Sequence, residues 1–355
     1  MSEPLRVLVL ADSRSFHTER YLGEMTRQGC EVLVASLEEG PIQYHQLRRK
    51  GSIRALHYPL AAAEVSRLVR VFKPHVVNPH FASGYGFLAA LAARLARKPI
   101  LLHLWGSDIL IAPRKSFLHR RKTRLALETA DFVVGDSDFL LDEAEKIGRI
   151  SARRTIPWGI ERAHLSCYRE DVVWQAPLKI VVPRPHEPIY NNLFIVRALS
   201  ELIRDEKIKI IFPNWGSEVS NFVNKTVDLA GRRPDLYSPK PRRDYLEFAA
   251  GHHLYLSAAR SDSSPASLLE AMGLGLIPIA GDIPGVREWL NPESGYLFDL
   301  SDESSLFEVV DGLLENLDDH QLMRQTNRER IERQAVFEDN VSATIAIMNE
   351  LAGRG

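Results

Sequence analysis

The chain has little cysteine, little net charge and no long apolar run. Its two cysteines, Cys30 and Cys167, form neither a CxxC pair nor a disulfide framework, so we expect a reducing compartment. A formal net charge of -1 excludes a generally basic protein that coats nucleic acid, and no nucleic-acid partner is expected. No apolar run approaches the roughly 18–20 residues that span a bilayer, and MSEPLRVLVLADS lacks the long apolar region of a signal peptide. We therefore expect a cytoplasmic protein, at most peripheral at the inner face of the membrane.

The chain does contain a regular alternation of short apolar runs and helical patterns. Its 355 residues suit two domains, and 45% hydrophobic with 26% charged residues is a globular composition. Continuous apolar runs between helices indicate parallel strands that are buried on both faces. The sequence predicts an α/β protein with two doubly wound, Rossmann-like domains, at 1–165 and 175–340, around a polar linker at 160–177. The last helix, in 341–355, is expected to join the first domain. The predicted strands are RVLVLA, EVLVAS, HVVNPH, PILLHLWG and FVVGDS, then KIVVPR, KIIFPN, HLYLSAA and LIPIAG.

The most informative segment is LSAARSDSSPASLLEAMGLGLIPIAGDIPGVREWL, residues 256–290. It predicts an acidic loop, a helix, a turn of small residues, a buried strand and a glycine turn. Ser263 and Ser264 are expected to cap the helix, with Pro265 in its first turn. The first backbone N–H groups of the helix are then available to a diphosphate. Asp262 and Glu270 border this helix terminus, an arrangement that suits a hydroxyl-rich ligand.

These two acids resemble the acid-x7-acid signature of the retaining family 4 glycosyltransferases. Residues 267–290 are similar to the donor-sugar helix of that family and the strand and loop after it. Four earlier segments carry the same resemblance: SFHTERYLGEMTRQGCEVLVAS, PHFASGYG, LHLWGSDIL and TIPWGIE. The resemblance implies the GT-B arrangement, with the two domains facing a central cleft. It further implies transfer of a sugar, with retention, from a nucleotide diphosphate sugar to a hydroxyl of a glycan or lipid-linked acceptor.

The resemblance also assigns roles at the donor site. Glu270 is expected to bind the ribose hydroxyls, Asp262 the donor sugar and Arg184 the diphosphate, where a guanidinium stabilises the departing group. Members of the family usually carry a lysine five residues after this arginine, but this chain has Ile189. Further donor-binding candidates are Ser263, Ser264, Ala266 and Ser267, with Arg260, Lys240 or Arg242 as replacements for the missing lysine.

Candidates in the first domain lie around WGSD. Many relatives have histidine where this chain has Trp105, next to the reacting sugar. His103 lies two residues earlier, on the same strand face, and is a candidate for positioning the acceptor. Asp108 is either a site residue or the N-cap of the next helix. Packing and a role in the cleft explain His17, His80 and Tyr85 equally well.

Some features of the sequence also bear on functions other than glycosyl transfer. The loop Asp12–Thr18 lacks the glycine-rich pattern of a dinucleotide-binding dehydrogenase. Asp136-Ser137-Asp138 matches a metal-binding DxD, but it lies between a strand and a helix, so we expect helix capping, with no metal and no cofactor beyond the donor. Ile189 and the shortened acid Asp262 favour a non-catalytic nucleotide-sugar-binding protein, and a sugar-nucleotide epimerase shares the architecture. The spacing does not encode the donor base, the sugar or the acceptor.

One charge run stands apart from these motifs. The stretch Arg114–Arg124 is basic, contains no acid and interleaves Phe117 and Leu118 with its charges. A solvated helix face is the ordinary explanation. The pattern also suits an anionic membrane surface or a phosphorylated acceptor.

Overall fold

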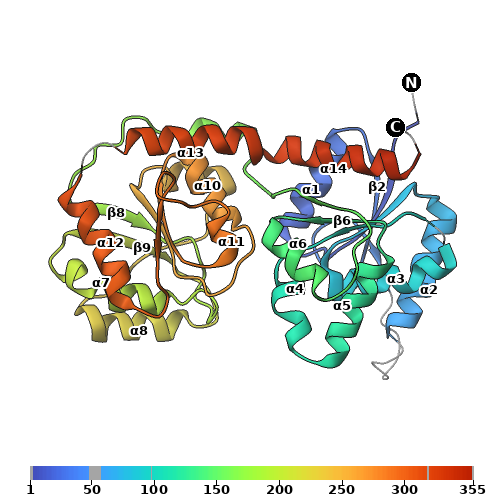
Figure 1. The fold of residues 1–355 in the computed structure, drawn as a ribbon, viewed down its shortest axis with the longest axis horizontal. Coiled ribbons are helices and arrows are strands. Elements are labelled where there is room, and N and C mark those ends of the chain that lie inside the picture. Colours follow the sequence, from blue (N-terminus) through green and yellow to red (C-terminus); the bar gives the residue numbers. More distant parts are fainter. Residues whose placement is uncertain (1–2, 48–56, 97, 318–319, 354–355) are drawn as a thin grey trace. The chain divides into compact units, whose positions relative to one another are not determined.

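The structure is a computed structural model that describes residues 3–47, 57–96, 98–317 and 320–353. The chain divides into two units, and in Figure 1 the first is coloured blue to green with the red helix α14. The first unit runs to Pro157 and resumes at Glu338; the second is Trp158–Phe337. No helix in the described part of the chain is both long and apolar enough to cross a bilayer.

The first unit is a parallel sheet with helices between its strands. Its strands are hydrogen-bonded in the orders β3-β2-β1-β4 and β5-β6-β7, and bridges at Val77–Ile100 and His80–His103 continue β4 into β5. Order 3-2-1-4-5-6 is that of a doubly wound Rossmann fold, whose switch point lies between β1 and β4. The strands are β1 (Arg6–Leu10), β2 (Glu31–Ser36), β3 (His45–Gln46), β4 (Val76–Pro79), β5 (Leu101–His103), β6 (Phe132–Gly135) and β7 (Arg153–Thr155). The α-helices are α1 (Phe16–Arg27), α2 (His57–Phe72), α3 (Phe87–Ala96), α4 (Ser107–Leu110), α5 (Phe117–Thr129), α6 (Asp138–Glu145) and α14 (Phe337–Leu351).

The second unit repeats the same topology. Its parallel strands lie in the order β10-β9-β8-β11-β12-β13, so the switch point falls between β8 and β11. The strands are β8 (Leu178–Val181), β9 (Ile208–Pro213), β10 (Asp235–Tyr237), β11 (Leu254–Ser257), β12 (Ile277–Gly281) and β13 (Tyr296–Phe298). The helices are α7 (Asn192–Arg204), α8 (Val219–Ala230), α9 (Arg242–Ala249), α10 (Ala266–Leu274), α11 (Pro284–Arg287), α12 (Glu303–Glu315) and α13 (Gln321–Gln334).

The apolar runs explain why these strands form at the centre of each unit. In β11, Leu254 and Leu256 join one buried cluster while Tyr255 joins the cluster on the opposite face. Successive strand side chains point to opposite faces, so a continuous apolar run supplies two cores at once. Each predicted strand coincides with an observed one, and the predicted α/β fold with two parallel sheets is confirmed.

The boundary between the units differs from the expected one. Residues 158–165 belong to the second unit, because Ile160 forms a parallel β-bridge with Val336. The predicted linker at 160–177 contains a short 3-10 helix, Arg162–Cys167, whose Leu165 and Cys167 are buried in the core with Ile160. Ile160, Leu165 and Cys167 therefore pack as part of the second unit, whereas Val173 of the same stretch is exposed.

Candidate functional site

The switch point of the second unit brings two predicted donor residues together. Arg184 follows β8 and Asp262 follows β11, and these neighbouring parallel strands both end at the same edge of the sheet. The Nη2 atom of Arg184 donates to Oδ2 of Asp262 at 2.6 Å, and its guanidinium lies 5.2 Å from the Tyr190 ring centroid. Ligands of open parallel sheets bind at this position, beyond the carboxyl ends of the strands.

Glu270 forms a second buried ion pair in the same unit. Its side chain lies in α10 and is only 9% exposed, and its Oε1 atom accepts from Nη2 of Arg242 at 2.6 Å. The same Arg242 nitrogen lies 3.7 Å from Oε2 of Glu161. Burial acts to lower the pKa of Arg242, but the charges of Glu270 and Glu161 outweigh it, so the pKa is raised. The guanidinium therefore stays charged and holds the Glu270 carboxylate in one position.

The start of α10 corrects one prediction. Pro265 occupies the N-cap position rather than the first turn, and no described side chain caps the helix. Ser264 instead accepts from the Trp289 indole N–H at 2.9 Å, and the Ser263 N–H donates to Asp262. Both serines are buried, and the hydroxyl of Ser264 is used by Trp289 of another element. The first N–H groups of α10, at Ala266 and Ser267, have no acceptor within the helix.

A close backbone contact fixes the loop before this helix. A Cβ atom at Gly285 would lie 1.9 Å from the carbonyl oxygen of Ser263. The glycine of the predicted second turn is therefore required for the loop at Asp262 to pack against α11.

Arg260 lies beside the position of the missing lysine. Its backbone N–H donates to the Ile189 carbonyl at 2.9 Å, and its guanidinium donates to Oδ1 of Asn191 at 3.0 Å. Lys240 instead lies over the Phe248 ring, and Arg242 is paired with Glu270. Of the three candidate replacements, Arg260 is thus the one that contacts the Ile189 loop.

In the first unit, the predicted histidines form a buried network around Asn78. The amide nitrogen of Asn78 donates to the Leu101 carbonyl at 2.7 Å and lies 3.0 Å from Nδ1 of His103. Its amide oxygen therefore accepts from the hydroxyl of Tyr21 and from Nε2 of His80, each at 3.1 Å. Because that oxygen can only accept, His80 carries its proton on Nε2, and His103 accepts at Nδ1. Burial lowers the pKa of His103 to about 3 and places that of His80 well below its usual value.

Asp108 and Trp105 form the loop that follows β5. Oδ2 of Asp108 accepts from the Ala82 N–H at 2.7 Å, and Oδ1 accepts from the Trp105 N–H at 2.9 Å. Gly106 is the N-cap of α4, so the alternative role of Asp108 as that cap is wrong. Burial raises the pKa of Asp108 to about 6. The Trp105 ring packs against His80 and against His17, each with centroids 5.6 Å apart.

The first unit also contains a cavity, and the sequence indicated only some of the residues that line it. Its volume is about 360 Å³, and it lies at the carboxyl ends of β1, β2 and β4. Of the predicted cleft residues His80, Tyr85 and Trp105 line it, whereas His17 is not among its lining residues. Glu38 and Tyr58 also line the cavity but were not predicted from the sequence. The sequence offers only weak indications of their role: Glu38 follows the end of β2, and Tyr58 lies at the start of α2.

No metal centre is evident in the described residues, where no group of three His, Cys, Asp or Glu side chains converges. The predicted capping at Asp136-Ser137-Asp138 is confirmed, since Oγ of Ser137 accepts from the Leu140 N–H at 3.1 Å at the start of α6. Asp138 accepts from the hydroxyl of Thr155.

Comparison with known proteins identifies the family. The glycosyl transferase 4-like model matches residues 6–137, and the glycosyl transferases group 1 model matches residues 233–330. The chain is a GT4-like glycosyltransferase of the GT-B fold. The matched segments of this GT4-like chain hold the first-unit candidates and the Asp262–Glu270 helix, respectively. Arg184 and Ile189 lie between the two matches.

Individual relatives of the GT4-like chain agree with this assignment. TuaC of Bacillus subtilis (strain 168), assigned as a teichuronic acid biosynthesis glycosyltransferase, is 24% identical over 262 residues, and the match covers 72% of this chain and 65% of TuaC. Anabaena HepE, solved in complex with UDP-glucose, has a TM-score of 0.77 at 15% identity, with 96% and 99% of the two chains covered. Sucrose-phosphate synthase from Thermosynechococcus elongatus has a TM-score of 0.80 at 12% identity, with 99% and 100% covered.

Proposed function

We propose that this chain transfers a sugar, with retention, from a nucleoside diphosphate sugar to a hydroxyl of a glycan or lipid-linked acceptor. The observation that carries the proposal is the Arg184–Asp262 pair at the switch point of the second unit, at the edge where α10 begins without a side-chain cap. A guanidinium fork and helix N-terminal N–H groups both suit a diphosphate. HepE binds UDP and UDP-glucose, which supports a UDP-sugar as the donor of this chain.

The paired residues give a defined sequence of contacts. Without donor, Asp262 neutralises Arg184. When the diphosphate binds, it takes the guanidinium of Arg184, and the Asp262 carboxylate becomes an acceptor for hydroxyls of the donor sugar. Glu270, which Arg242 holds in place, accepts from the ribose hydroxyls. Transfer then depends on positioning and on the charge of Arg184 at the departing diphosphate, without a metal ion.

A non-catalytic nucleotide-sugar-binding protein is the second candidate, and Ile189 favours it because one expected cation is missing. The contact of Arg260 with the Ile189 loop argues the other way, since it places a replacement cation beside that position. We therefore assign the second diphosphate contact to Arg260.

The test is calorimetric titration with UDP-glucose and related donors, followed by analysis of the products with excess EDTA present. We expect donor binding and release of UDP. We also expect the new glycosidic bond to have the same anomeric configuration as the donor sugar. Arg184→Ala should weaken binding by about ten- to a hundredfold, because a hydrogen bond between charged groups contributes about 1.5–3 kcal/mol. The matched control is Arg153→Ala, which removes an exposed arginine that pairs with Asp142 at 2.8 Å in the other unit. Binding without turnover supports the second candidate, an isomerised donor supports an epimerase, and an absolute requirement for added metal ions contradicts the proposed chemistry.

The basic segment Arg114–Arg124 is proposed to bind an anionic membrane surface. Phe117 and Leu118, at the start of α5, are 74% and 61% exposed, and the surrounding cations are exposed as well. Lys122 differs from its neighbours, because its ammonium lies over the rings of Tyr58 and Phe87. Exposed apolar side chains ringed by cations suit the interface of an anionic bilayer, at about 1 kcal/mol per cation.

Co-sedimentation with phosphatidylserine vesicles tests this surface. Wild type should bind at low salt and release at moderate salt, because ions screen the attraction. A variant with Lys115, Arg120, Arg121 and Arg124 changed to Gln should lose binding. The control variant changes four exposed cations of the second unit to Gln: Arg204, Lys207, Lys209 and Lys225. Equal loss in both variants, or no binding by wild type, rejects the membrane role and leaves a solvated helix face.

A further inference from the structure

The cavity of the first unit combines aromatic rings with carboxylates. It has a volume of about 360 Å³, within the range of small-molecule sites. Tyr58, Phe81, Tyr85 and Trp105 supply the aromatic part of its wall, and Asp12 and Glu38 supply the acids. Apolar ring faces beside fixed hydrogen-bond acceptors match a sugar ring, which has C–H bonds on its faces and hydroxyls at its edge.

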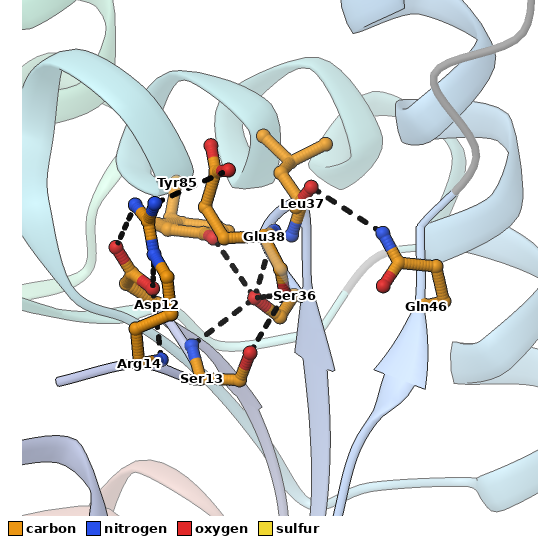
Figure 2. Close-up of polar contacts among 8 residues, drawn as sticks. All are labelled: Asp12, Ser13, Arg14, Ser36, Leu37, Glu38, Gln46 and Tyr85. Carbon is orange, nitrogen blue, oxygen red and sulfur yellow. Dashed lines mark hydrogen bonds and ion pairs between the residues drawn. The ribbon is translucent and has the colours of Figure 1, made fainter. Parts of the chain in front are cut away.

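The acidic wall is held rigidly by the two loops that follow β1 and β2. Figure 2 shows Arg14 between the two carboxylates: Nε and Nη2 donate to the two oxygens of Asp12 at 3.0 and 2.7 Å, and Nη1 lies 3.8 Å from Glu38. Ser13 donates to the Glu38 carbonyl at 2.6 Å. A Cβ atom at Gly40 would lie 2.3 Å from the Ser13 carbonyl oxygen, so the loops are in direct backbone contact.

Tyr85 ties the second loop to the rest of the unit. Its hydroxyl oxygen accepts from the Leu37 N–H at 3.0 Å and lies 3.2 Å from Oγ of Ser36 (Figure 2). Oγ of Ser36 in turn donates to the Glu38 carbonyl at 2.9 Å and accepts from the N–H groups of Ser13 and Glu38 at 3.2 and 3.1 Å, so the Tyr85 hydroxyl joins the hydrogen-bond network of this loop. Tyr85 is therefore a positioning residue: its hydroxyl is committed to the loop, and its ring forms part of the cavity wall.

The remaining wall stores backbone strain. Phe81 has φ of +80°, a left-handed conformation that is unfavourable for a bulky residue. The residues Phe81–Gly86 form a turn of π-helix, which is rare in proteins and concentrated at functional sites. Both features are at the carboxyl end of β4, beside the switch point of the first sheet. Strain of this kind persists where the surrounding structure and a function maintain it.

The charge of the wall limits the ligand. Among the described residues that line the cavity there is no lysine or arginine, and His80 is kept neutral by burial. Arg14 is engaged by Asp12, and Lys122 is outside the lining, over the rings of Tyr58 and Phe87. Among the described lining residues, an anionic sugar would therefore meet carboxylates and no lysine or arginine, whereas the hydroxyls of an uncharged sugar can donate to Asp12 and Glu38.

We propose that this cavity binds an uncharged sugar ring, which is the terminal residue of the acceptor. The assignment of that ring as the acceptor rests on the proposed glycosyl transfer. The cavity should therefore prefer a glycan with a neutral terminal sugar over one that ends in a uronic acid or a phosphorylated sugar.

The test is saturation-transfer NMR on the full chain without donor. The probes are the methyl glycosides of glucose, galactose, mannose and N-acetylglucosamine, compared with those of glucuronic and galacturonic acid. At least one neutral glycoside should bind about tenfold or more tightly than either uronide. Tyr58→Ala should weaken it by about tenfold while Tyr58→Phe retains it, because the ring face makes the contact. Glu38→Gln should reduce the preference for the neutral sugar, and Glu39→Gln, an equal charge change at an exposed neighbour, should not.

Failure of this inference and failure of the proposed function give different results. The same preparations are titrated with UDP-glucose, and melting temperatures verify that each variant is folded. If UDP-glucose binds but none of the neutral glycosides does, or the uronides bind equally well, the cavity assignment is overturned and the donor site stands. If a neutral glycoside binds but no nucleotide sugar does, the cavity is a sugar site and the glycosyl-transfer proposal fails.

Discussion

Several polar residues of the two candidate sites are held by an ion pair or a hydrogen bond to another side chain. Glu270 is buried against Arg242, Asp262 holds Arg184, and Asn78 orders two histidines. A buried charge without a partner is costly, so each acid that is expected to contact the donor is stabilised by a cation until the ligand arrives.

Glu270→Gln should weaken UDP binding by about ten- to a hundredfold, because a neutral amide is a poorer acceptor for two ribose hydroxyls. It should also lower the free energy of unfolding by about 1–3 kcal/mol, because Arg242 loses its nearest carboxylate. Arg242→Gln is the control, since it breaks the same ion pair but keeps the Glu270 carboxylate. Calorimetry and urea denaturation measure both effects; equal losses of UDP affinity in the two variants would contradict the ribose assignment.

The buried histidines predict a dependence of stability on acid. The pKa of His103 is lowered to about 3 in the fold, whereas an unfolded histidine titrates near 6.5. The unfolded state therefore binds the extra proton, and stability falls as the pH drops from about 6.5 toward 3, by at most about 1.4 kcal/mol per pH unit. Asp108 opposes this trend: its pKa is raised to about 6, so its contribution is present below about pH 4 and is lost as the pH rises through 6.

His103→Gln isolates the histidine, because the amide oxygen of glutamine can still accept from Asn78 but does not titrate. Urea denaturation at pH 4.5, 5.5, 6.5 and 7.5 should show a shallower loss of stability in the variant. Identical pH slopes for variant and wild type would show that His103 is accessible to protons in the folded state.

At the scale of elements, the proposed donor site depends on how α10 and α11 meet. The loop that holds Asp262 lies against α11, and the contact leaves no space for a side chain at Gly285. The helix terminus itself lacks the expected serine cap because Ser264 is used by Trp289.

Gly285→Ala should force the Asp262 loop to move, and overpacking of this kind typically costs about 1–3 kcal/mol. Donor affinity should fall with it, because Asp262 and the start of α10 lose their geometry. Gly312→Ala is the matched control: it lies within α12, a Cβ atom there meets open space, and alanine should raise stability by up to about 1 kcal/mol. Differential scanning calorimetry with and without UDP distinguishes the two; unchanged UDP affinity in Gly285→Ala contradicts the role of this contact.

At the scale of the whole molecule, each unit has its own parallel sheet and its own core. The predicted donor residues all lie in the second unit, and the cavity that is proposed to bind an uncharged sugar lies in the first. Each sheet offers its switch point as the place where loops from neighbouring strands converge.

UDP should therefore stabilise the second unit by mass action, by about 2.7 kcal/mol at a concentration of 100 times its dissociation constant. Hydrogen exchange should show protection in residues 184–190 and 260–270, which hold the Arg184 loop and the start of α10. The Arg184→Ala variant, at the same UDP concentration, serves as the control. Protection confined to the first unit would place the nucleotide elsewhere.

The sequence by itself determined the two parallel sheets, since continuous apolar runs between amphipathic helices can only be buried by strands covered on both faces. It also indicated which segments to expect at the donor site, because Asp262, Glu270 and Arg184 stand in motifs of local spacing, and their donor roles stay a prediction. Tertiary structure decided their partners: Arg242, Glu161 and Trp289 come from other elements, and nothing in local sequence indicates that Ser264 faces an indole. It also decided that residues 158–165 pack with the second unit and that Asp12, Glu38 and Tyr58 share one cavity. Strand order sets which loops become neighbours, and it depends on pairings between distant segments that spacing along the chain does not encode.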